Sequence, residues 1–382
     1  MSASVTLRAV GDVALIARAA EALVAGRSTE WDETARVLAS ADLTFANFEM
    51  ALPGAGAVRA RPDVSPDLMG VAAALDPFLE AGIDVAALAT NHIMDWGQDG
   101  LADTLALFRK RRVAVVGAGL SLDEAIEPVI LARSGIRIGV AAFTPAQSWT
   151  AGPTTPGAAP LELEHVERAL NLMEERGADV RIISLHWGLE MSSYPTPSDR
   201  ELASRIAESG ADLILGHHPH VIQGMERFGS TPVVYSMGNF IFDIDAGRIE
   251  HGFDPEDLRS ACMVEATLSV DGVTDVRLVP VRLDEHGIGC IATGEAARRI
   301  DGRIRECSEA IEAGAAAVWE HAGTRLVGHK LKVMRAALQD NGPLYVLSGL
   351  RRVRPRHLKL LWGFVVGRFR RQRRCDSGKA GD

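Results

Sequence analysis

Short β-type runs alternate with amphipathic helical stretches from the start of the chain to about residue 245, and this alternation constrains the fold most strongly. The β-type runs cover residues 6–12, 43–49, 85–92, 113–119, 137–143, 180–187, 213–217 and 233–240. The helical patterns between them include residues 75–82, 101–111, 163–177 and 201–210. Alternation of this kind is typical of an α/β domain whose sheets are covered by helices. We therefore predict an α/β fold.

The pattern changes towards the end of the chain. Residues 261–283 alternate between apolar and polar side chains around an Asp-Gly pair at 271–272, which predicts a β-hairpin that closes the domain. After about residue 290 the pattern becomes helical. A chain of 382 residues can hold one large domain and an appendage. We predict a catalytic domain over 1–290 and a helical extension over 291–382.

The net charge of −9 is distributed unevenly. Residues 351–374 carry ten lysines and arginines and no acidic residue. Removing those ten positive charges from the net charge leaves −19 on the rest of the chain. We therefore expect no binding of nucleic acid by the main body, since nucleic-acid-binding domains are usually basic.

The four cysteines, Cys262, Cys290, Cys307 and Cys375, lie far apart and form no CxxC pair. This spacing indicates a reducing compartment and argues against a disulfide framework or a structural zinc site. The first residues lack the pattern of a secretory signal peptide, and no run of 18 apolar residues predicts a transmembrane helix. We expect a cytoplasmic protein.

Polar residues capable of chemistry stand at the ends of five β-type runs. They are Asp12, Asn47 with Glu49, Asn91 with His92, His186, and the histidines at 217, 218 and 220. In open α/β folds, functional groups collect at the carboxyl ends of strands. Taken singly, each has an ordinary explanation: a turn or helix cap for Asp12 and Asn91, an exposed strand end for Glu49, and a buried structural histidine for His186.

Taken together, these side chains predict a metal site. Imidazole, carboxylate and amide groups without cysteine suit Mn, Fe, Zn or a similar divalent ion. Six such groups exceed the needs of one four-coordinate ion. They suit two ions that share a bridging carboxylate, an arrangement that activates water and polarises a substrate oxygen.

A series of motifs resembles the CapA family, the poly-γ-glutamate and capsule synthesis type within the calcineurin-like metallophosphatase superfamily. The resemblance covers about residues 5–245 through GD (11–12), ADLTFANFE (41–49), ATNHIMDWGQDGL (89–101), VVGAG (115–119), SLHWGLE (184–190), GADLILGHHPHVIQG (210–224) and VVYSMGNFIFD (233–243). It implies a calcineurin-like sandwich of two β-sheets flanked by helices, with a dinuclear metal centre at the strand ends. We expect a helical C-terminal extension after this sandwich.

The resemblance also implies a role for each matching residue. Asp12 and His220 would bind one ion, and Asn91, His186 and His218 would bind the other. Glu49 would bridge the two ions in place of the superfamily's usual aspartate. His92 would act as the general acid or base. Apart from these motif assignments, Asn47, Asp95, His217 and Asn239 are candidates for residues that support the ligands, and His217 is alternatively a substitute ligand.

Two departures from the superfamily pattern stand out. The histidine usually found two residues after the first aspartate is replaced by Ala14, which leaves one ion position a ligand short. The closing GHxH motif appears as GHHPH, in which we favour His218 and His220 as the ligand pair. Pro219 would fix the turn that aims both imidazoles the same way.

Three functions follow from the resemblance. The first is a metal-dependent hydrolase or biosynthetic enzyme that acts on a peptide, a poly-γ-glutamate-type polymer or a phosphorylated or acidic small substrate. The second is a metal-dependent peptide epimerase that moves a Cα proton. The third is a non-catalytic accessory protein of capsule polymer synthesis. His92 weighs against the third function, and Ala14 weighs against a standard phosphomonoesterase.

The basic segment 350–374 encloses a short apolar run between arginine clusters. It is too short to span a bilayer but is suited to peripheral contact with an anionic membrane at its inner face. A basic cover over the acidic body, an arm that grips an acidic substrate and a solvated terminal helix are the alternatives.

Overall fold

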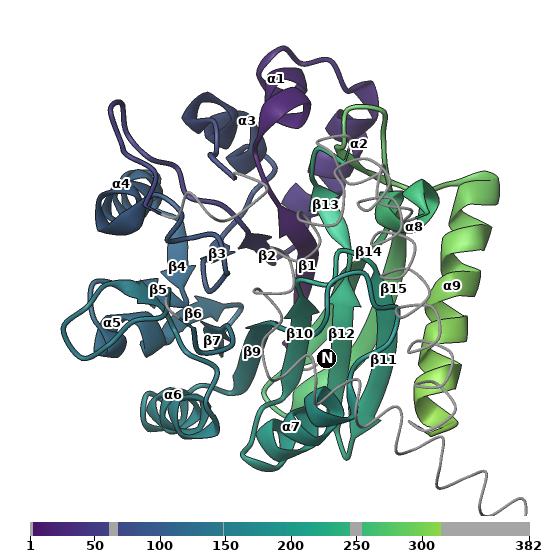
Figure 1. Cartoon of the computed structure of the whole chain (residues 1–382). Helices are drawn as coiled ribbons and strands as arrows, with labels where there is room; N and C mark the ends of the chain where they lie inside the picture. Colours follow the sequence, from purple (N-terminus) through teal and green to yellow (C-terminus); the bar gives the residue numbers. More distant parts are fainter. Residues whose placement is uncertain (1–2, 61–67, 148, 245–253, 315–382) are drawn as a thin grey trace, which may run out of the picture. The chain divides into compact units, whose positions relative to one another are not determined.

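Two β-sheets pack against each other in the computed structural model, which describes residues 3–60, 68–147, 149–244 and 254–314 (Figure 1). The first sheet has the strand order β16 (Gly289–Ile291), β15 (Gly272–Leu283), β14 (Ser260–Ser269), β1 (Val5–Val13), β2 (Leu43–Phe48), β3 (Val85–Ala87) and β4 (Ala114–Val116), with β13 (Asn239–Ile241) also paired to β1. The second has the order β11 (Ile222–Phe228), β12 (Thr231–Met237), β10 (Leu213–His217), β9 (Val180–His186), β7 (Ile136–Phe143) and β6 (Val129–Arg133). A small third sheet pairs β5 (Ala118–Gly119) with β8 (Gly157–Ala158).

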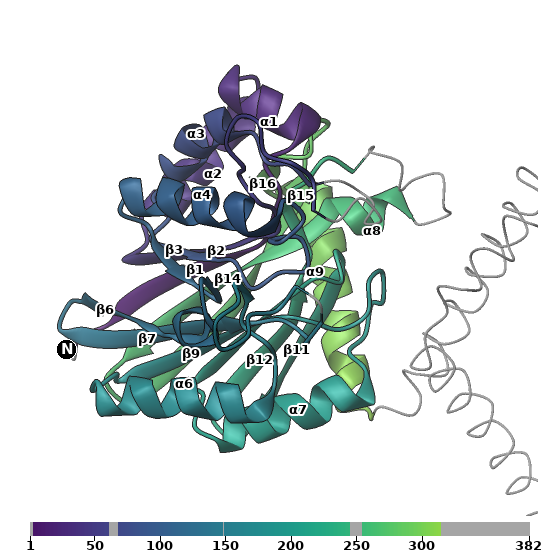
Figure 2. The same ribbon diagram turned by 60° about the vertical axis from the view of Figure 1, so that its left-hand side comes forward.

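Helices cover the outer faces of both sheets (Figure 2). The first sheet is covered by α1 (Ala17–Val24), α2 (Thr29–Ala39), α3 (Leu75–Leu79) and α4 (Gly97–Lys110), with the short 3₁₀ helix η1 (Ala72–Ala74) before α3. The second is covered by α5 (Leu122–Ile126), α6 (Leu163–Glu175) and α7 (Pro197–Glu208). Two further helices are α8 (Pro255–Arg259) and α9 (Gly294–Glu312). The predicted α/β sandwich of two sheets flanked by helices is confirmed.

The inter-sheet core consists of aliphatic side chains from alternate positions of facing strands. Leu7 of β1 and Phe45 of β2 meet Ile182 of β9 and Leu215 of β10 in one buried cluster. Because successive side chains of a strand point to opposite faces, the neighbouring residues pack against the helices instead. Both faces of each central strand are therefore buried, which explains why these runs read as almost continuously apolar in the sequence.

The C-terminal part of the described chain belongs to the same body as the sheets. The predicted hairpin over 261–283 is present as β14 and β15, which pair antiparallel. Helix α9 falls within the predicted extension, yet its Ile300 and Ile304 lie in the inter-sheet core. The rest of that extension, with the basic segment 350–374 and Cys375, lies outside the described residues, so the division at 290 stays a prediction. Within the described ranges, none of the helices is both long enough and apolar enough to cross a membrane.

The strand register places polar residues at one level in each sheet. Asp12 of β1 lies opposite Asn47 of β2 on one side and Asn239 of β13 on the other. In the second sheet, His186 of β9 lies opposite His217 of β10. These pairs occupy the carboxyl ends of parallel strands, where functional groups of α/β folds gather.

We expect opposite effects from two glycine-to-alanine substitutions. A Cβ on Gly216 of β10 would lie 2.0 Å from the carbonyl oxygen of Tyr235, whereas a Cβ on Gly302 of α9 would meet no atom within 4 Å. Gly216→Ala should therefore destabilise the protein by about 3 kcal/mol, and Gly302→Ala should stabilise it by about 0.5–1 kcal/mol. Chemical denaturation measures both, and a neutral Gly216→Ala would contradict the close approach of β10 and β12.

Candidate metal centre

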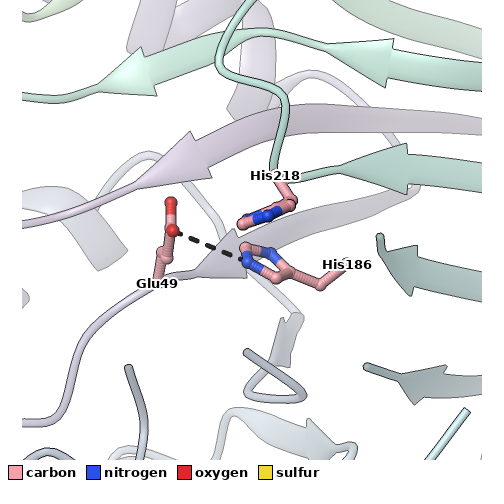
Figure 3. Close-up of side chains that lie close together, drawn as sticks. All are labelled: Glu49, His186 and His218. Atoms are coloured by element: carbon pink, nitrogen blue, oxygen red, sulfur yellow. Dashed lines mark ion pairs between the residues drawn. The ribbon is translucent and has the colours of Figure 1, made fainter. Parts of the chain in front are cut away.

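Two groups of side chains that could hold a metal ion share Glu49, and all their members are buried except the half-buried His218. The first group is Glu49, His186 and His218, and the second is Asp12, Glu49 and His220. In each group, one candidate ligand atom from every residue lies within 4.8 Å of the others. Figure 3 shows Glu49 facing His186, with the ring of His218 beside them. The structure thus brings together five of the six predicted ligands in two groups.

The spacing of the ligand atoms fits an ion better than a hydrogen bond. Oε1 of Glu49 lies 3.5 Å from Nε2 of His186 and 3.6 Å from Nε2 of His220. Both distances exceed the 3.2 Å limit of an ordinary hydrogen bond between nitrogen and oxygen. Two ligands bonded to one divalent ion at about 2.1 Å lie about 3.4 Å apart in tetrahedral geometry. The donor set and its spacing therefore fit a divalent ion on each side of Glu49.

Glu49 and Asp12 are placed by adjacent strands of the first sheet. The backbone N–H of Glu49 donates to the carbonyl oxygen of Val13 (2.9 Å), which keeps the residue just after β2 alongside the end of β1. Asp12 is fully buried. Its Oδ1 accepts a hydrogen bond from Nδ2 of Asn47 (2.9 Å) and its Oδ2 accepts one from the backbone N–H of His218 (3.1 Å). Asn47 thus contacts Asp12 directly, and its supporting role stays a prediction.

Asn91, the sixth predicted ligand, lies beside the first group. Its Oδ1 is 2.8 Å from Nε2 of His186, and Nδ1 of the same ring is 3.2 Å from Nδ2 of Asn47. Burial and the neighbouring His92 lower the pKa of His186 well below its ordinary value. A neutral imidazole at pH 7 is the form that binds metal ions. Asn91 is thus hydrogen bonded to His186 and places an amide oxygen beside the Glu49, His186 and His218 group.

The turn that carries His218 and His220 has an unusual backbone. His218 has a φ of 94° and His220 a φ of 60°, on either side of Pro219. Residues other than glycine rarely occupy this left-handed region, and those that do cluster at functional sites. Pro219 was predicted to shape this turn, but the two left-handed histidines were not predicted.

Asn239 fixes the ring of His220. Nδ1 of His220 lies 2.9 Å from Oδ1 of Asn239, and Nδ2 of Asn239 donates to the carbonyl oxygen of His220 (3.3 Å). The ring of Phe242 packs against the imidazole at a centroid distance of 5.0 Å. A hydrogen bond at one ring nitrogen sets the tautomer and aims the other nitrogen at an ion. Nε2 of His220 therefore points towards Glu49.

His217 lies outside both groups. Its ring is buried against Phe45, and its Nδ1 is 3.8 Å from Oδ1 of Asp12, too far for a hydrogen bond. Within the described ranges, neither ring nitrogen has a hydrogen-bond partner. Burial, with a smaller contribution from His186, lowers the pKa of His217 well below its ordinary value. His217 thus lies close to Asp12 but in neither ligand group, and its role as a supporting residue or a substitute ligand stays a prediction.

His92 and Asp95 form a buried pair next to the two groups. Nδ1 of His92 lies 2.6 Å from Oδ2 of Asp95, and both side chains are buried. The turn between them is closed by a bond from the backbone N–H of Asp95 to the carbonyl oxygen of His92 (3.1 Å). A carboxylate at Nδ1 orients an imidazole and leaves Nε2 to exchange protons. This geometry suits the acid–base role predicted for His92.

Ala14 occupies the position at which the resemblance led us to expect a histidine in other proteins. It is fully buried, and its backbone N–H donates to the carbonyl oxygen of Ile241 (2.7 Å). No side-chain ligand comes from this position. Within the described residues, Asp12, Glu49 and His220 are therefore the candidate carboxylate and imidazole ligands of the second group.

Residues 187–196, which follow His186, form part of the surroundings of the site. The sequence did not identify this segment. The backbone N–H of Met191 donates to the carbonyl oxygen of Pro219 (2.9 Å), between the two left-handed histidines. The SLHWGLE motif marks the start of this segment. Nothing in the sequence pattern indicates a main-chain contact with a turn about 30 residues away.

The chain matches the profile of the family described as bacterial capsule synthesis protein PGA_cap over residues 6–244. It is 32% identical to the PGA biosynthesis protein CapA of Bacillus subtilis over 52% of this chain and 50% of that protein. It is 28% identical to a probable polyglutamine synthesis accessory protein of Mycobacterium tuberculosis over 66% of this chain and 70% of that protein. The alignments with the Bacillus relatives thus span about half the length of those proteins.

Solved structures are more distant. The calcineurin-like phosphoesterase YfkN of Bacillus subtilis is 13% identical, with a TM-score of 0.43, over 80% of this chain and 98% of that chain. Similarity at this level says nothing about substrate or activity.

We predict that His217 makes the metal-free protein less stable in acid. The unfolded chain binds a proton at this residue below its ordinary pKa of about 6.5, whereas the folded chain does not. The free energy of unfolding should therefore fall as pH drops below about 6.5, by up to about 1.4 kcal/mol per pH unit. The measurement compares wild type with His217→Leu by chemical denaturation from pH 7.5 to 5.5, so that contributions from other groups cancel. Equal pH slopes for the two proteins would contradict a buried neutral His217.

The strain at His218 predicts a reversal of the usual order of alanine and glycine. Glycine ordinarily costs about 0.5–1 kcal/mol relative to alanine, but at a φ of 94° alanine keeps the left-handed strain that glycine relieves. In metal-free protein, His218→Gly should therefore be about 1 kcal/mol more stable than His218→Ala. Thermal or chemical unfolding checks the order, and a less stable glycine variant would show that the turn is unstrained.

Proposed function

This chain belongs to the bacterial capsule synthesis protein family, and we propose that it is a metal-dependent hydrolase in which Glu49 bridges two divalent ions. The observation that carries the proposal is the position of Oε1 of Glu49, which lies 3.5–3.6 Å from the imidazoles of both His186 and His220. Asp12 and His220 would hold one ion, and Asn91, His186 and His218 the other. The donors are imidazole, carboxylate and amide groups, which suit Mn, Fe or Zn.

When bound, two such ions supply an activated water and polarise the substrate oxygen that it attacks. The residues of the chain then provide orientation and proton transfer. Asp95 holds Nδ1 of His92, so Nε2 of His92 is the nitrogen that accepts or donates a proton at the substrate. Asn47 and Asn239 keep Asp12 and His220 in place through their amide groups. The buried surroundings exclude bulk water and strengthen these polar interactions.

We propose an acidic peptide or a poly-γ-glutamate-type polymer as the substrate, cleaved at an amide bond. The names of two relatives support this class, since one refers to PGA biosynthesis and the other to polyglutamine synthesis. A phosphoester is the other substrate class that the same donors could serve. Screening peptides and phosphoesters in parallel distinguishes the two.

An accessory role in polymer synthesis without turnover is the second candidate. The observation in its favour is the name of the Mycobacterium tuberculosis relative, which describes an accessory protein. The buried pair of His92 and Asp95 favours the enzyme instead, because a binding protein has no use for an oriented acid–base group beside its ligands.

The first test is the metal content of Glu49→Gln. We expect about two ions per wild-type chain, because Glu49 is shared by two ligand groups. Loss of the shared carboxylate should weaken binding of both ions by about 100-fold or more. Elemental analysis of protein purified without chelator measures this, and Glu174→Gln, an exposed glutamate of α6, is the matched control. Full metal content in Glu49→Gln would disprove the bridging role.

Activity is then measured on metal-loaded protein with acidic peptides and phosphoesters. New amino termini or free phosphate would support hydrolysis. Inversion at Cα with uptake of deuterium from the solvent, without cleavage, would replace the hydrolase with a peptide epimerase. His92→Gln should lower the rate by about 10²–10⁴-fold at unchanged metal content. A fully loaded wild type that turns over neither class would favour the accessory role.

A further inference from the structure

The histidine turn of the candidate metal centre needs external support. His218 and His220 both have left-handed backbones. Such strained residues persist only where the surrounding structure holds them in place. Besides Asp12 and Asn239, which contact His218 and His220 from the first sheet side, the segment 187–194 bonds to the turn. We name this segment the clamp.

Two main-chain hydrogen bonds join the clamp to the turn. The backbone N–H of Trp187 donates to the carbonyl oxygen of His217 (3.1 Å), at the entrance of the turn. The backbone N–H of Met191 donates to the carbonyl oxygen of Pro219 (2.9 Å), at its centre. Met191 itself has a left-handed φ of 61°. The clamp is thus strained at Met191, the residue that contacts Pro219. It therefore also needs contacts with the surrounding structure to keep this conformation.

Side chains of β11 and α9 donate hydrogen bonds to the clamp. Nε2 of Gln223 donates to the carbonyl oxygen of Ser192 (2.8 Å). Nη2 of Arg303 donates to Oγ of Ser193 (2.6 Å). The side chain of Arg303 is only 19% exposed, so this hydrogen bond is well protected from water. A charged donor in such a place holds its acceptor more firmly than an exposed group would.

Helix α9 is a rigid base for Arg303. Ile300 and Ile304, on either side of Arg303 in the sequence, are part of the inter-sheet core. One turn further on, Oγ of Ser308 accepts a hydrogen bond from the backbone N–H of Met225 (3.0 Å), which ties the helix to β11. A continuous set of contacts therefore runs from α9 through Ser193 and Met191 to Pro219.

We propose that Arg303 is a positioning residue of the metal centre, which acts through the clamp on the turn that carries His218 and His220. Helix α9 lies in the part of the chain predicted to be a helical extension. On this proposal it contributes to the geometry of the metal centre. This inference rests on the proposed metal-binding function. It assigns Arg303 no contact with an ion or a substrate.

A purely structural role for Arg303 has a different consequence. Nη1 of Arg303 also pairs with Oε2 of Glu306 on the same helix (3.0 Å), and α9 is anchored by its apolar residues. Removing the bond to Ser193 should therefore leave α9 and the core in place. The expected effect is on metal affinity, which depends on ligand geometry, and much less on the stability of the metal-free protein.

The test is titration of the full-length, chelator-stripped protein with Mn²⁺ by calorimetry. Arg303→Ala and Ser193→Ala should each weaken Mn²⁺ binding by about three- to tenfold, the equivalent of one lost hydrogen bond. Because both remove the same bond, the double variant should bind no more weakly than either single variant. Arg298→Ala, an exposed arginine of the same helix, is the matched control and should bind Mn²⁺ within twofold of wild type.

The outcomes separate this proposal from the proposed function. Wild-type affinity in Arg303→Ala and Ser193→Ala, with Mn²⁺ bound normally by wild type, would overturn the positioning role alone. Strictly multiplicative losses in the double variant would also overturn it. A wild type that binds no Mn²⁺, Fe²⁺ or Zn²⁺ would overturn the metal centre and the positioning role together. Thermal unfolding of each stripped variant checks the fold, and Ser193→Ala keeps the test decisive where Arg303→Ala fails to fold.

Discussion

Two carboxylates buried among histidines, where the carboxyl ends of strands from both sheets meet, are the constraint on which the rest of this structure depends. Asp12 and Glu49 are 0% and 1% exposed, and burying a carboxylate is costly unless donors or cations surround it. Asn47 and the backbone N–H of His218 supply donors to Asp12. Neutral imidazoles offer lone pairs rather than positive charge. A divalent cation would satisfy both kinds of group at once.

This arrangement of side chains requires strained or closely packed backbone segments. The site residues are brought level by the sheet registers that pair Asp12 with Asn47 and His186 with His217. Gly216 lets β10 approach the carbonyl oxygen of Tyr235, while His218 and His220 accept left-handed conformations. Strain of this kind is common at functional sites, because precise ligand placement is maintained at the expense of stability.

The two sides of Glu49 are chemically different. Asn91 adds an amide oxygen beside His186 on one side, whereas Ala14 adds nothing beyond Asp12 and His220 on the other. The group of Glu49, His186 and His218 has two imidazoles and one carboxylate. The group of Asp12, Glu49 and His220 has one imidazole and two carboxylates. Imidazole and carboxylate donors differ in the ions that they prefer. The two candidate ligand groups are thus asymmetric, and the alanine at position 14 contributes to this difference.

Much of this protein could be predicted from the sequence because the relevant patterns are local. The alternation of β-type and helical runs predicted the α/β class, and the family resemblance implied the two-sheet sandwich. Polar residues at strand ends such as Asp12, Glu49 and His186 identified the candidate site. Residue types alone favoured a divalent ion of the Mn, Fe or Zn kind, whereas the pairing of His92 with Asp95 became visible only in the structure.

The tertiary structure decided the rest, because those features depend on contacts between residues distant in sequence. The family resemblance implied two groups of ligands around Glu49, but only sheet register and packing bring these residues together and leave His217 outside both groups. The left-handed turn at His218 and His220 is held by groups from other strands and from the clamp. Ile300 and Ile304 reach the inter-sheet core, although an amphipathic helical pattern cannot say which surface it covers. Periodicity shows which face of an element is buried, but long-range packing determines what that face meets.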